Sequence, residues 1–332
     1  MNKIIKRGLE VIFPIILGAI ILFWVYRNFN FRNAFYVFFH QMSWWWMFVT
    51  LAFGILSHVF RGIRWRQTLE PMGYKPKVRN CINAIFISYA ANLVLPRVGE
   101  VSRCGVLSRY DNVPFSKSFG TVVSERAIDT LMVILITGVT VVLQLGVFRR
   151  FFKRTGTNVD AIGNMFSSST FWIIVLSVVG VIALIYYLLR SFPISNKIKS
   201  VFRDIWEGIR TIGKVRNVPL FIFYTILIWM CYFLQFYLAF FSFAFTSDLS
   251  ILAGMVMFAA GSIAVVVPTP NGAGPWHFAI ISMMCIYGIN KADAGIFALL
   301  VHSIQTLLVA VLGVYGLMVL PFINKKKSYG NN

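Results

Sequence analysis

The chain has 332 residues, of which 58% are hydrophobic, 16% aromatic and 13% charged. Soluble globular domains carry roughly 45–50% apolar and about 25% charged residues, so this composition excludes a water-soluble enzyme with a solvated surface. The formal net charge is +20. In a soluble protein such an excess would indicate nucleic-acid binding. Here the charges separate long apolar runs, which favours contact with anionic lipid headgroups instead.

The N-terminal region resembles a signal peptide but lacks its cleavage site. Lys3, Lys6 and Arg7 precede an apolar stretch over residues 11–25, and no small-residue cleavage site follows before Tyr26. We therefore interpret this stretch as a retained first span. The four cysteines are dispersed without a C-x-x-C pair, which argues against a disulfide framework or a zinc site.

Six apolar windows are long enough to cross a hydrocarbon core of roughly 30 Å, which takes about 20 helical residues. They cover residues 11–26, 44–60, 119–148, 171–189, 219–245 and 295–320. Shorter apolar segments lie at 82–95, 251–267 and 276–289. Segments of about 10–14 residues are typical of re-entrant arms. The sequence therefore predicts an all-α polytopic membrane protein with about six transmembrane helices and two re-entrant helical hairpins.

The connector at residues 268–275 reads Pro-Thr-Pro-Asn-Gly-Ala-Gly-Pro and carries no charge. Non-helical backbone at membrane depth is tolerated where protein or a water-filled cavity satisfies its polar groups. We therefore favour a re-entrant pair over residues 249–290. Two thin crossings are the alternative that charge counting leaves open.

Basic residues are distributed unevenly between alternate loops. If the N-terminus is cytoplasmic, 23 Lys and Arg residues fall in cytoplasmic segments and seven on the opposite side. Cytoplasmic loops carry the excess of positive charge, which predicts cytoplasmic N- and C-termini. The basic cluster at 149–154 runs against this rule. The count also requires residues 82–95 to enter and leave on the cytoplasmic side, because both flanks are basic.

Residues 194–216 place isoleucine and valine at three- and four-residue spacing, with lysine and arginine between them. This pattern is typical of an amphipathic helix on the inner leaflet, although a solvated connector is the alternative. We expect a single transmembrane domain over residues 1–324 that includes this interfacial helix. A basic cytoplasmic tail follows over residues 325–332.

Two segments share a short internal similarity. The first segment, at 95–100, reads Leu-Pro-Arg-Val-Gly-Glu, and Arg126 follows 30 residues after its proline. The second, at 269–274, reads Thr-Pro-Asn-Gly-Ala-Gly, and His302 follows 32 residues after its proline. Arg126 and His302 each begin a stretch of the form x-x-Ile-x-Thr-Leu. An inverted repeat would account for this match, and transporters use such repeats to alternate access around a midplane site. Chance similarity is the alternative for so short a match.

Glu125, Arg126 and Asp129 lie within an apolar span. Each isolated charge at the bilayer centre costs roughly 2.5–3.5 kcal/mol on the insertion scale, so three together need a reason. Glu125 and Asp129 share a helix face, and Arg126 can pair with Asp129. One interpretation is a salt bridge that only holds helices together. The other is a polar cavity in which Arg126 attracts a headgroup phosphate.

Arg97, Glu100 and Arg103 follow Pro96 at three-residue spacing, so a helix beginning there would carry an alternating basic, acidic and basic stripe. Such a stripe is common on solvated surfaces. An interrupted helix, however, exposes backbone donors at which anionic groups bind, and this favours a functional role.

His277 and His302 lie in or near apolar surroundings, where a histidine is more typical of packing than of ligand binding. The sequence has no H-E-x-x-H motif, P-loop or Rossmann glycine pattern, so we expect neither a metal nor a cofactor.

Three motifs together indicate a family. Residues 92–103 (Asn-Leu-Val-Leu-Pro-Arg-Val-Gly-Glu-Val-Ser-Arg), 124–129 (Ser-Glu-Arg-Ala-Ile-Asp) and 268–274 resemble the lysylphosphatidylglycerol synthase transmembrane-region family, and the resemblance extends over about residues 61–320. It implies a polytopic inner-membrane protein with re-entrant helices that handles phospholipids, as in relatives that move aminoacylated phosphatidylglycerol between leaflets. Twelve residues follow Leu320, so we do not expect the soluble aminoacyl-transferase domain of some relatives.

The residues and the resemblance together predict a flippase-like phospholipid translocase rather than an enzyme. The alternatives are a membrane-embedded transferase acting on lipid-linked substrates, with Glu125 or Asp129 as general base, and a non-catalytic assembly partner. Expected partners are anionic phospholipids and not nucleic acid, with a homodimer and a separate lipid-modifying enzyme as further candidates. The candidate substrate-binding residues are Asn92, Pro96, Arg97, Gly99, Glu100, Arg103, Glu125, Arg126, Asp129, Pro270, Gly272, Gly274, His277 and His302.

Overall fold

The computed structural model describes residues 3–146 and 210–325, together with positions 169, 173, 177, 180, 206 and 207. Within these residues the chain forms ten α-helices and four short 3₁₀ helices, and no strand. The predicted span at 171–189 lies outside the described part of the chain, apart from isolated positions. Most of the predicted interfacial helix at 194–216 and of the tail at 325–332 also lies outside it.

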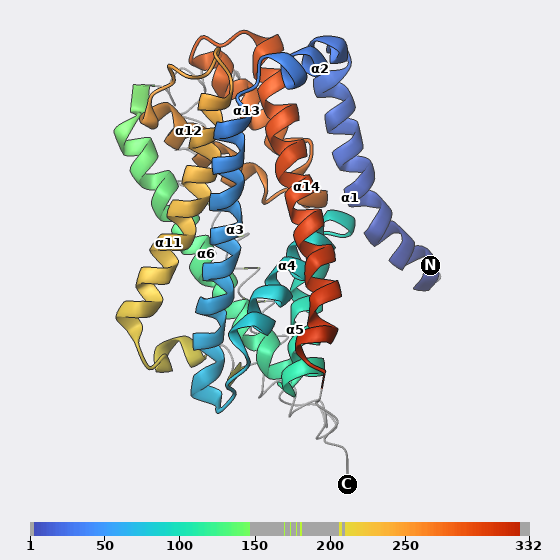
Figure 1. Ribbon diagram of the computed structural model, residues 1–332, viewed down its shortest axis with the longest axis vertical. Coiled ribbons are helices and arrows are strands. Elements are labelled where there is room, and N and C mark those ends of the chain that lie inside the picture. The colour runs from blue at the N-terminus through green and yellow to red at the C-terminus, as the bar shows by residue number, and fades with distance from the viewer. Residues whose placement is uncertain are drawn as a thin grey trace.

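Four described helices are long and apolar enough to cross a membrane, and they run along the long axis of the molecule (Figure 1). They are α3 (Trp44–Leu69), α6 (Phe115–Leu143), α11 (Val218–Tyr237) and α14 (Lys291–Ile323). Helices α1 (Lys3–Tyr26) and α2 (Phe31–His40) meet at a bend of 86° and add a fifth span if the pair counts as one. The protein is therefore an all-α polytopic membrane protein, as predicted.

Two pairs of shorter helices form hairpins at opposite ends of these spans. Helices α4 (Val78–Val94) and α5 (Val98–Asp111) lie toward the end where α14 finishes, and α12 (Ile251–Ala264) and α13 (Pro275–Ile286) lie toward the other end (Figure 1). Their lengths of 17, 14, 14 and 12 residues are all below the roughly 20 that a crossing requires. The arrangement therefore favours the re-entrant form over two thin crossings.

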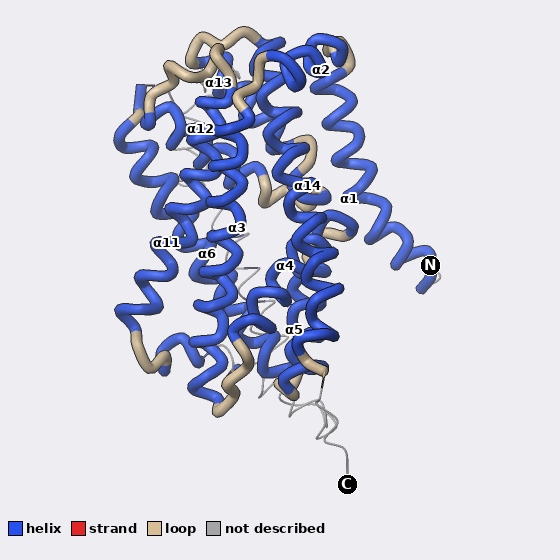
Figure 2. Tube along the Cα trace, in the orientation of Figure 1, coloured by secondary structure: helices blue, strands red, loops and turns tan. Residues whose placement is uncertain are grey.

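The tips of the two hairpins are built alike and lie near mid-height, where Figure 2 shows loop segments between the helices. A residue before proline is disfavoured in the helical region, and Leu95 before Pro96 and Thr269 before Pro270 are both extended. The residue after each proline is left-handed, with φ of 68° at Arg97 and 52° at Asn271. The shared backbone shape strengthens the case for an internal repeat.

The packing between the two halves also follows a reciprocal pattern. Helix α6, which follows the first hairpin, packs on α12 of the second, and α14, which follows the second hairpin, packs on α4 of the first. The preceding helices α3 and α11 pack against each other and run in opposite directions (Figure 1). Such an exchange of partners is typical of an inverted repeat.

Each hairpin is held in its own apolar core. One core joins α4 and α5 to the ends of α3 and α6, and its fully buried members include Trp65, Leu69, Cys81, Ala84, Cys104 and Leu107. The other joins α12 and α13 to α2, α3, α11 and α14, and its fully buried members include Met47, Phe240, Val256, Met257, Ile280 and Phe297. These two cores hold the hairpin tips in place.

The end of the second predicted span is corrected by the structure. The apolar window ends at residue 60, and the count of 23 cytoplasmic basic residues includes Arg61 and Arg64 as part of the loop that follows it. Helix α3 instead continues to Leu69, and both arginines are buried, with 2% and 0% of their surface exposed. The span continues because buried carboxylates on α6 compensate for the two charges.

Candidate functional site

Asp129 on α6 is shared by three arginines. It accepts from Arg61 at 2.7 Å, from Arg126 at 3.0 Å and from Arg64 at 3.2 Å. Arg61 and Arg64 are three residues apart on α3, so both can face the same carboxylate. The predicted pairing of Arg126 with Asp129 is present.

Glu125, one turn before Asp129, is completely buried and connects α6 to two other helices. It accepts from Arg103 of α5 at 2.7 Å and from Arg64 of α3 at 3.3 Å. Glu100 of α5 lies 4.0 Å from Arg126. Two members of the predicted stripe, Glu100 and Arg103, therefore pair across to α6, whereas Arg97 is exposed at the start of α5.

We refer to these seven side chains as the ion-pair network: Arg61, Arg64, Arg103, Arg126, Glu100, Glu125 and Asp129. Four positive and three negative charges leave one net positive charge. Buried charges persist only when they are paired and hydrogen-bonded. Arg126 is the most exposed member, with 42% of its side-chain surface accessible, followed by Glu100 with 20%. It is the network's most accessible cation.

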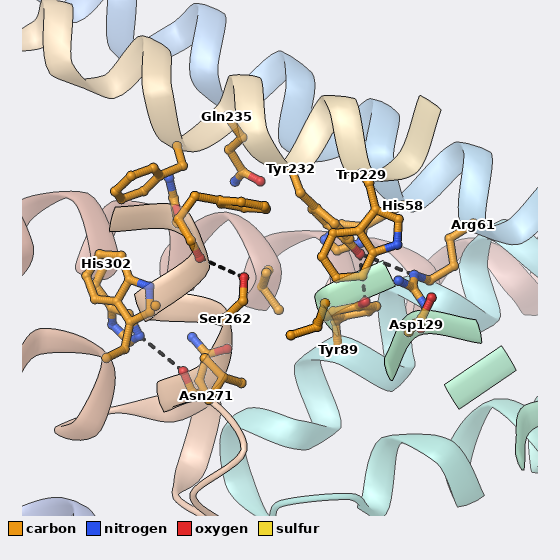
Figure 3. Close-up of a pocket in the computed structure, with 18 of the residues that line it drawn as sticks. His58, Arg61, Tyr89, Asp129, Trp229, Tyr232, Gln235, Ser262, Asn271 and His302 are labelled. Atoms are coloured by element: carbon orange, nitrogen blue, oxygen red, sulfur yellow. Dashed lines mark hydrogen bonds and ion pairs between the residues drawn. The ribbon is translucent and has the colours of Figure 1, made fainter. Parts of the chain in front are cut away.

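A cavity of about 450 Å³ adjoins the network (Figure 3). Its size falls within the roughly 300–1,000 Å³ that is typical of small-molecule sites. Helices α3, α4, α6, α11, α12 and α14 and the short helix η4 (Pro270–Gly272) all contribute to its wall. It therefore lies between the two hairpins and draws residues from both halves of the repeat.

One end of the cavity is charged. Arg61 and Asp129 lie there with two tyrosines (Figure 3), and Arg126 also lines the cavity and pairs with Asp129. The hydroxyl groups of Tyr89 and Tyr232 are 2.7 Å apart, and Arg61 Nε donates to the Tyr232 hydroxyl at 3.2 Å. These contacts fix the Arg61 guanidinium, whereas Arg126 keeps surface that can face a ligand.

The opposite end is polar but uncharged. His302 Nε2 lies 3.2 Å from the Asn271 carbonyl oxygen, and the Asn271 amide donates to Thr306 Oγ1 at 2.8 Å. Trp276, with its ring centre 5.2 Å from that of His302, and Gln305, about one turn after His302 on α14, also line the cavity. The left-handed tip of the second hairpin is thus anchored to α14 by side-chain hydrogen bonds, and its polar groups face the cavity.

The residues predicted from the sequence fall into three groups. Those that line the cavity are Arg126, Asp129 and His302. Those in the wall behind it are Glu100, Arg103, Glu125 and His277, the last with its ring centre 4.5 Å from that of His302. Those that shape the hairpin tips are Asn92, Pro96, Arg97, Gly99, Pro270, Gly272 and Gly274.

The residues at the tips have identifiable structural roles. Asn92 Oδ1 accepts from the Gly99 backbone N–H at 2.8 Å and so closes the first tip. A Cβ atom at Gly99 would collide with the Ser88 carbonyl oxygen, which explains the glycine. At the second tip His277 Nδ1 accepts from the Gly274 backbone N–H at 3.3 Å. His277 is therefore a packing and capping residue.

Sequence reasoning missed several cavity residues, namely His58, Arg61, Tyr89, Trp229, Tyr232, Gln235 and Gln305. A signal for Arg61 and Arg64 was available in the sequence. The two arginines are about one helical turn apart, as are Glu125 and Asp129, so each pair lies on one face of its helix and the two faces can pair. The aromatic and amide residues gave no such signal in a chain that is 16% aromatic. Within the described residues no group of three or more His, Cys, Asp or Glu side chains could hold a metal.

Fold and site together define a polytopic α-helical membrane protein with a polar cavity between two opposed helical hairpins. Residues 11–313 match the family described as the lysylphosphatidylglycerol synthase TM region. The chain belongs to this family, and the prediction from its motifs is confirmed.

Three curated relatives extend the comparison. A UPF0104 membrane protein of Methanothermobacter thermautotrophicus is 23% identical over 291 residues, which cover 81% of this chain and 82% of the relative. A UPF0104 membrane protein of Methanocaldococcus jannaschii is 30% identical over 95 residues, 27% of this chain and 28% of that protein. The glycosyltransferase AglD of Haloferax volcanii is 37% identical over 89 residues, 26% of this chain and 14% of AglD. The last two matches thus cover small parts of those proteins. No solved structure matches the chain.

Proposed function

We propose that the protein is a flippase-like translocase for anionic or modified phospholipids. The observation that carries this proposal is Arg126, a cation with 42% of its side chain exposed on the wall of a cavity of about 450 Å³ between the hairpins. A guanidinium group matches a phosphate in charge and in bidentate geometry. The remaining arginines of the network are buried and hold Arg126 and its carboxylate partners in position.

The two hairpins approach the cavity from opposite ends of the bundle (Figure 1). Opposed broken helices are the elements with which transporters expose a midplane site to one side and then the other. Helix α6 carries Arg126 and Asp129 and packs on α12 of the second hairpin. Movement of that hairpin would therefore be transmitted directly to the charged end of the cavity. The sequence has no nucleotide-binding motif, so we expect movement to follow a gradient.

The geometry gives less support to the transferase alternative. A general base needs a lone pair that is free to take a proton. Glu125 is bound by two arginines, and Asp129 by three. Carboxylates that act as shared counterions are poor proton acceptors. The match to part of a glycosyltransferase keeps sugar-bearing substrates within the range to be tested.

The proposal is tested in liposomes that contain the purified protein and a fluorescent phosphatidylglycerol. The measurement is the fraction of lipid that an external quencher reaches over time, for wild type, Arg126→Ala and the control Arg109→Ala on the exposed side of α5. We expect wild type and Arg109→Ala to move lipid and Arg126→Ala to lose most of the rate. If wild type matches empty liposomes with every headgroup tested, the transport proposal fails. If Arg126→Ala keeps the full rate, the site assignment fails.

A further inference from the structure

Building on the proposed function, we infer that the cavity selects a lipid with one phosphodiester and an uncharged headgroup that bears hydroxyl groups, such as glycerol or a sugar. The same features disfavour a cationic aminoacyl headgroup. The inference rests on how charge and hydrogen-bonding groups are divided between the two ends of the cavity (Figure 3).

All the formal charge on the cavity wall is at one end. The charged lining residues among those described are Arg61, Arg126 and Asp129, and they are contiguous through their ion pairs. The other end presents Asn271, Gln305 and the neutral groups around them. A ligand whose phosphate meets Arg126 therefore places the rest of its headgroup among groups without formal charge.

No carboxylate on the described cavity wall is free to bind an ammonium group. Asp129 is the single carboxylate among the lining residues, and three guanidinium groups already share it. The tyrosine rings at that end are also occupied by a cation, because the Arg61 guanidinium carbon lies 5.6 Å from the Tyr232 ring centre and 5.9 Å from that of Tyr89. An ammonium group on the headgroup would therefore find no free counterion among the described lining residues.

Neutral donors, by contrast, are available. Gln305 and Trp229 line the cavity, and their buried side-chain nitrogens, Gln305 Nε2 and Trp229 Nε1, have no hydrogen-bond partner among the described residues. Trp229 is 9% exposed. Buried donors are rarely left unpaired, because the loss of hydration costs about 1–3 kcal/mol for each group. Hydroxyl and phosphoryl oxygens are the acceptors that would satisfy them.

Gln235 adds a group that can both donate and accept. Its side chain lies so close to α3 that a Cβ atom at Gly54 would approach its Nε2 to 2.6 Å. The glycine therefore holds open the space in which the amide sits at the cavity wall. Paired donor and acceptor functions suit a hydroxyl group, which can play both roles at once. The ring of Trp276 lies 5.2 Å from that of His302, and the ring of Trp229 lies 6.0 Å from that of Tyr232, so both ends of the cavity wall offer flat apolar surface.

The test compares lipids with identical acyl chains and different headgroups. Binding of the purified full-length protein in detergent is measured for phosphatidylglycerol, phosphatidylinositol, lysylphosphatidylglycerol and phosphatidylmethanol. Phosphatidylmethanol keeps the single negative charge but has no headgroup hydroxyl. The variants are Gln305→Leu and Arg126→Gln, and the matched control is Gln41→Leu at the exposed end of α2.

We expect the hydroxyl-bearing lipids to bind at least about tenfold more tightly than lysylphosphatidylglycerol and phosphatidylmethanol, the change expected from one or two hydrogen bonds. Gln305→Leu should remove roughly tenfold of the affinity for phosphatidylglycerol and leave phosphatidylmethanol unchanged. Arg126→Gln should weaken all anionic lipids together. Equal or tighter binding of lysylphosphatidylglycerol would overturn the inference, as would an equal effect of Gln305→Leu on phosphatidylmethanol.

The same lipids in the liposome assay separate this inference from the proposed function. Selective binding without movement of any lipid would refute the translocase and leave the headgroup assignment intact. Movement at equal rates for all four headgroups, together with equal binding, would refute the headgroup assignment and leave the translocase intact.

Discussion

Arg103 and Glu125 form an ion pair of 2.7 Å in which neither side chain is more than 1% exposed. Arg103 belongs to the re-entrant helix α5, and Glu125 belongs to the spanning helix α6. The pair therefore fastens the first hairpin to a span at a point where water cannot replace either partner. Arg64 completes the group from α3, so three helices converge on a single carboxylate.

Replacement of Glu125 by leucine should strongly destabilise the protein. Removing one partner of a buried pair leaves an uncompensated charge and costs about 3–5 kcal/mol of unfolding free energy. We expect a marked fall in Tm, measured in detergent by circular dichroism. Glu70→Leu is the control, because the Arg66–Glu70 pair has both side chains 33% exposed. The double variant Glu125→Leu with Arg103→Met should recover part of the loss. Equal Tm values for Glu125→Leu and Glu70→Leu would contradict this role.

Replacement of Asp129 by asparagine should slow transport while strengthening the binding of anionic lipid. Asp129 is the counterion of three arginines, so its loss raises the net charge of the ion-pair network from one to two positive charges. A phosphate then binds more tightly to Arg126 and leaves more slowly. The measurements are the equilibrium binding of phosphatidylglycerol and the transport rate in liposomes. Asp248→Asn, at an exposed position before α12, is the control and should change neither. Weaker lipid binding by Asp129→Asn would show that this carboxylate contacts the lipid favourably.

Replacement of Gly99 by alanine should distort the first hairpin tip. The added Cβ atom would collide with the Ser88 carbonyl oxygen and displace the Asn92 side chain that binds the Gly99 N–H. We expect a lower Tm and faster hydrogen exchange at residues 92–100. Gly105→Ala is a control in the same helix, because nothing lies within 4 Å of the position that its added Cβ atom would take, and alanine is favoured over glycine in helices. A Gly99→Ala protein as stable as Gly105→Ala would rule out close packing at this tip.

The hairpins could be predicted from the sequence because their causes are local. The segment lengths limit each arm to part of the membrane. Pro96 follows the end of α4, where Leu95 becomes extended, and α12 ends at Ala264, shortly before the extended Thr269 and Pro270. The ends of the spans were less predictable. A hydropathy scale assigns Arg61 the full cost of an unpaired charge and so ends the predicted span before it. Its partner Asp129 is 68 residues away in the sequence and becomes adjacent only after folding.

The same distinction applies to the site. Glu125, Arg126 and Asp129 were identifiable because charge within an apolar span is itself unusual. Both interpretations of these three residues describe part of the structure. Glu125 lies in a dry ion pair that joins helices, whereas Arg126 and Asp129 face a cavity. Tyr89 and Tyr232, by contrast, are 143 residues apart, and aromatic residues are so frequent in this chain that neither attracts notice.

The predicted orientation can be checked with single cysteines and a membrane-impermeant maleimide. The exposed residues Arg109, at the end of α5, and Asp248, before α12, lie at opposite ends of the bundle (Figure 1). We expect Arg109→Cys to react only after the membrane is opened and Asp248→Cys to react in intact cells, because the basic loops are predicted to be cytoplasmic. The single cysteines are introduced into a Cys285→Ser protein. Its remaining native cysteines, Cys81, Cys104 and Cys231, are buried, so they should react little with the maleimide.

Arg97→Cys extends the labelling experiment to the tip of the first hairpin. Arg97 is exposed on the protein, but a re-entrant arm holds it at membrane depth. We therefore expect little reaction from outside the cell, in contrast to Asp248→Cys. Rapid labelling of Arg97→Cys in intact cells would mean that α4 and α5 cross the membrane completely. Labelling of Arg109→Cys but not Asp248→Cys in intact cells would place the termini outside. Labelling at Arg97→Cys reports how deeply the hairpin lies in the membrane, and labelling at the two ends reports which way the protein is oriented, so the two questions are answered independently.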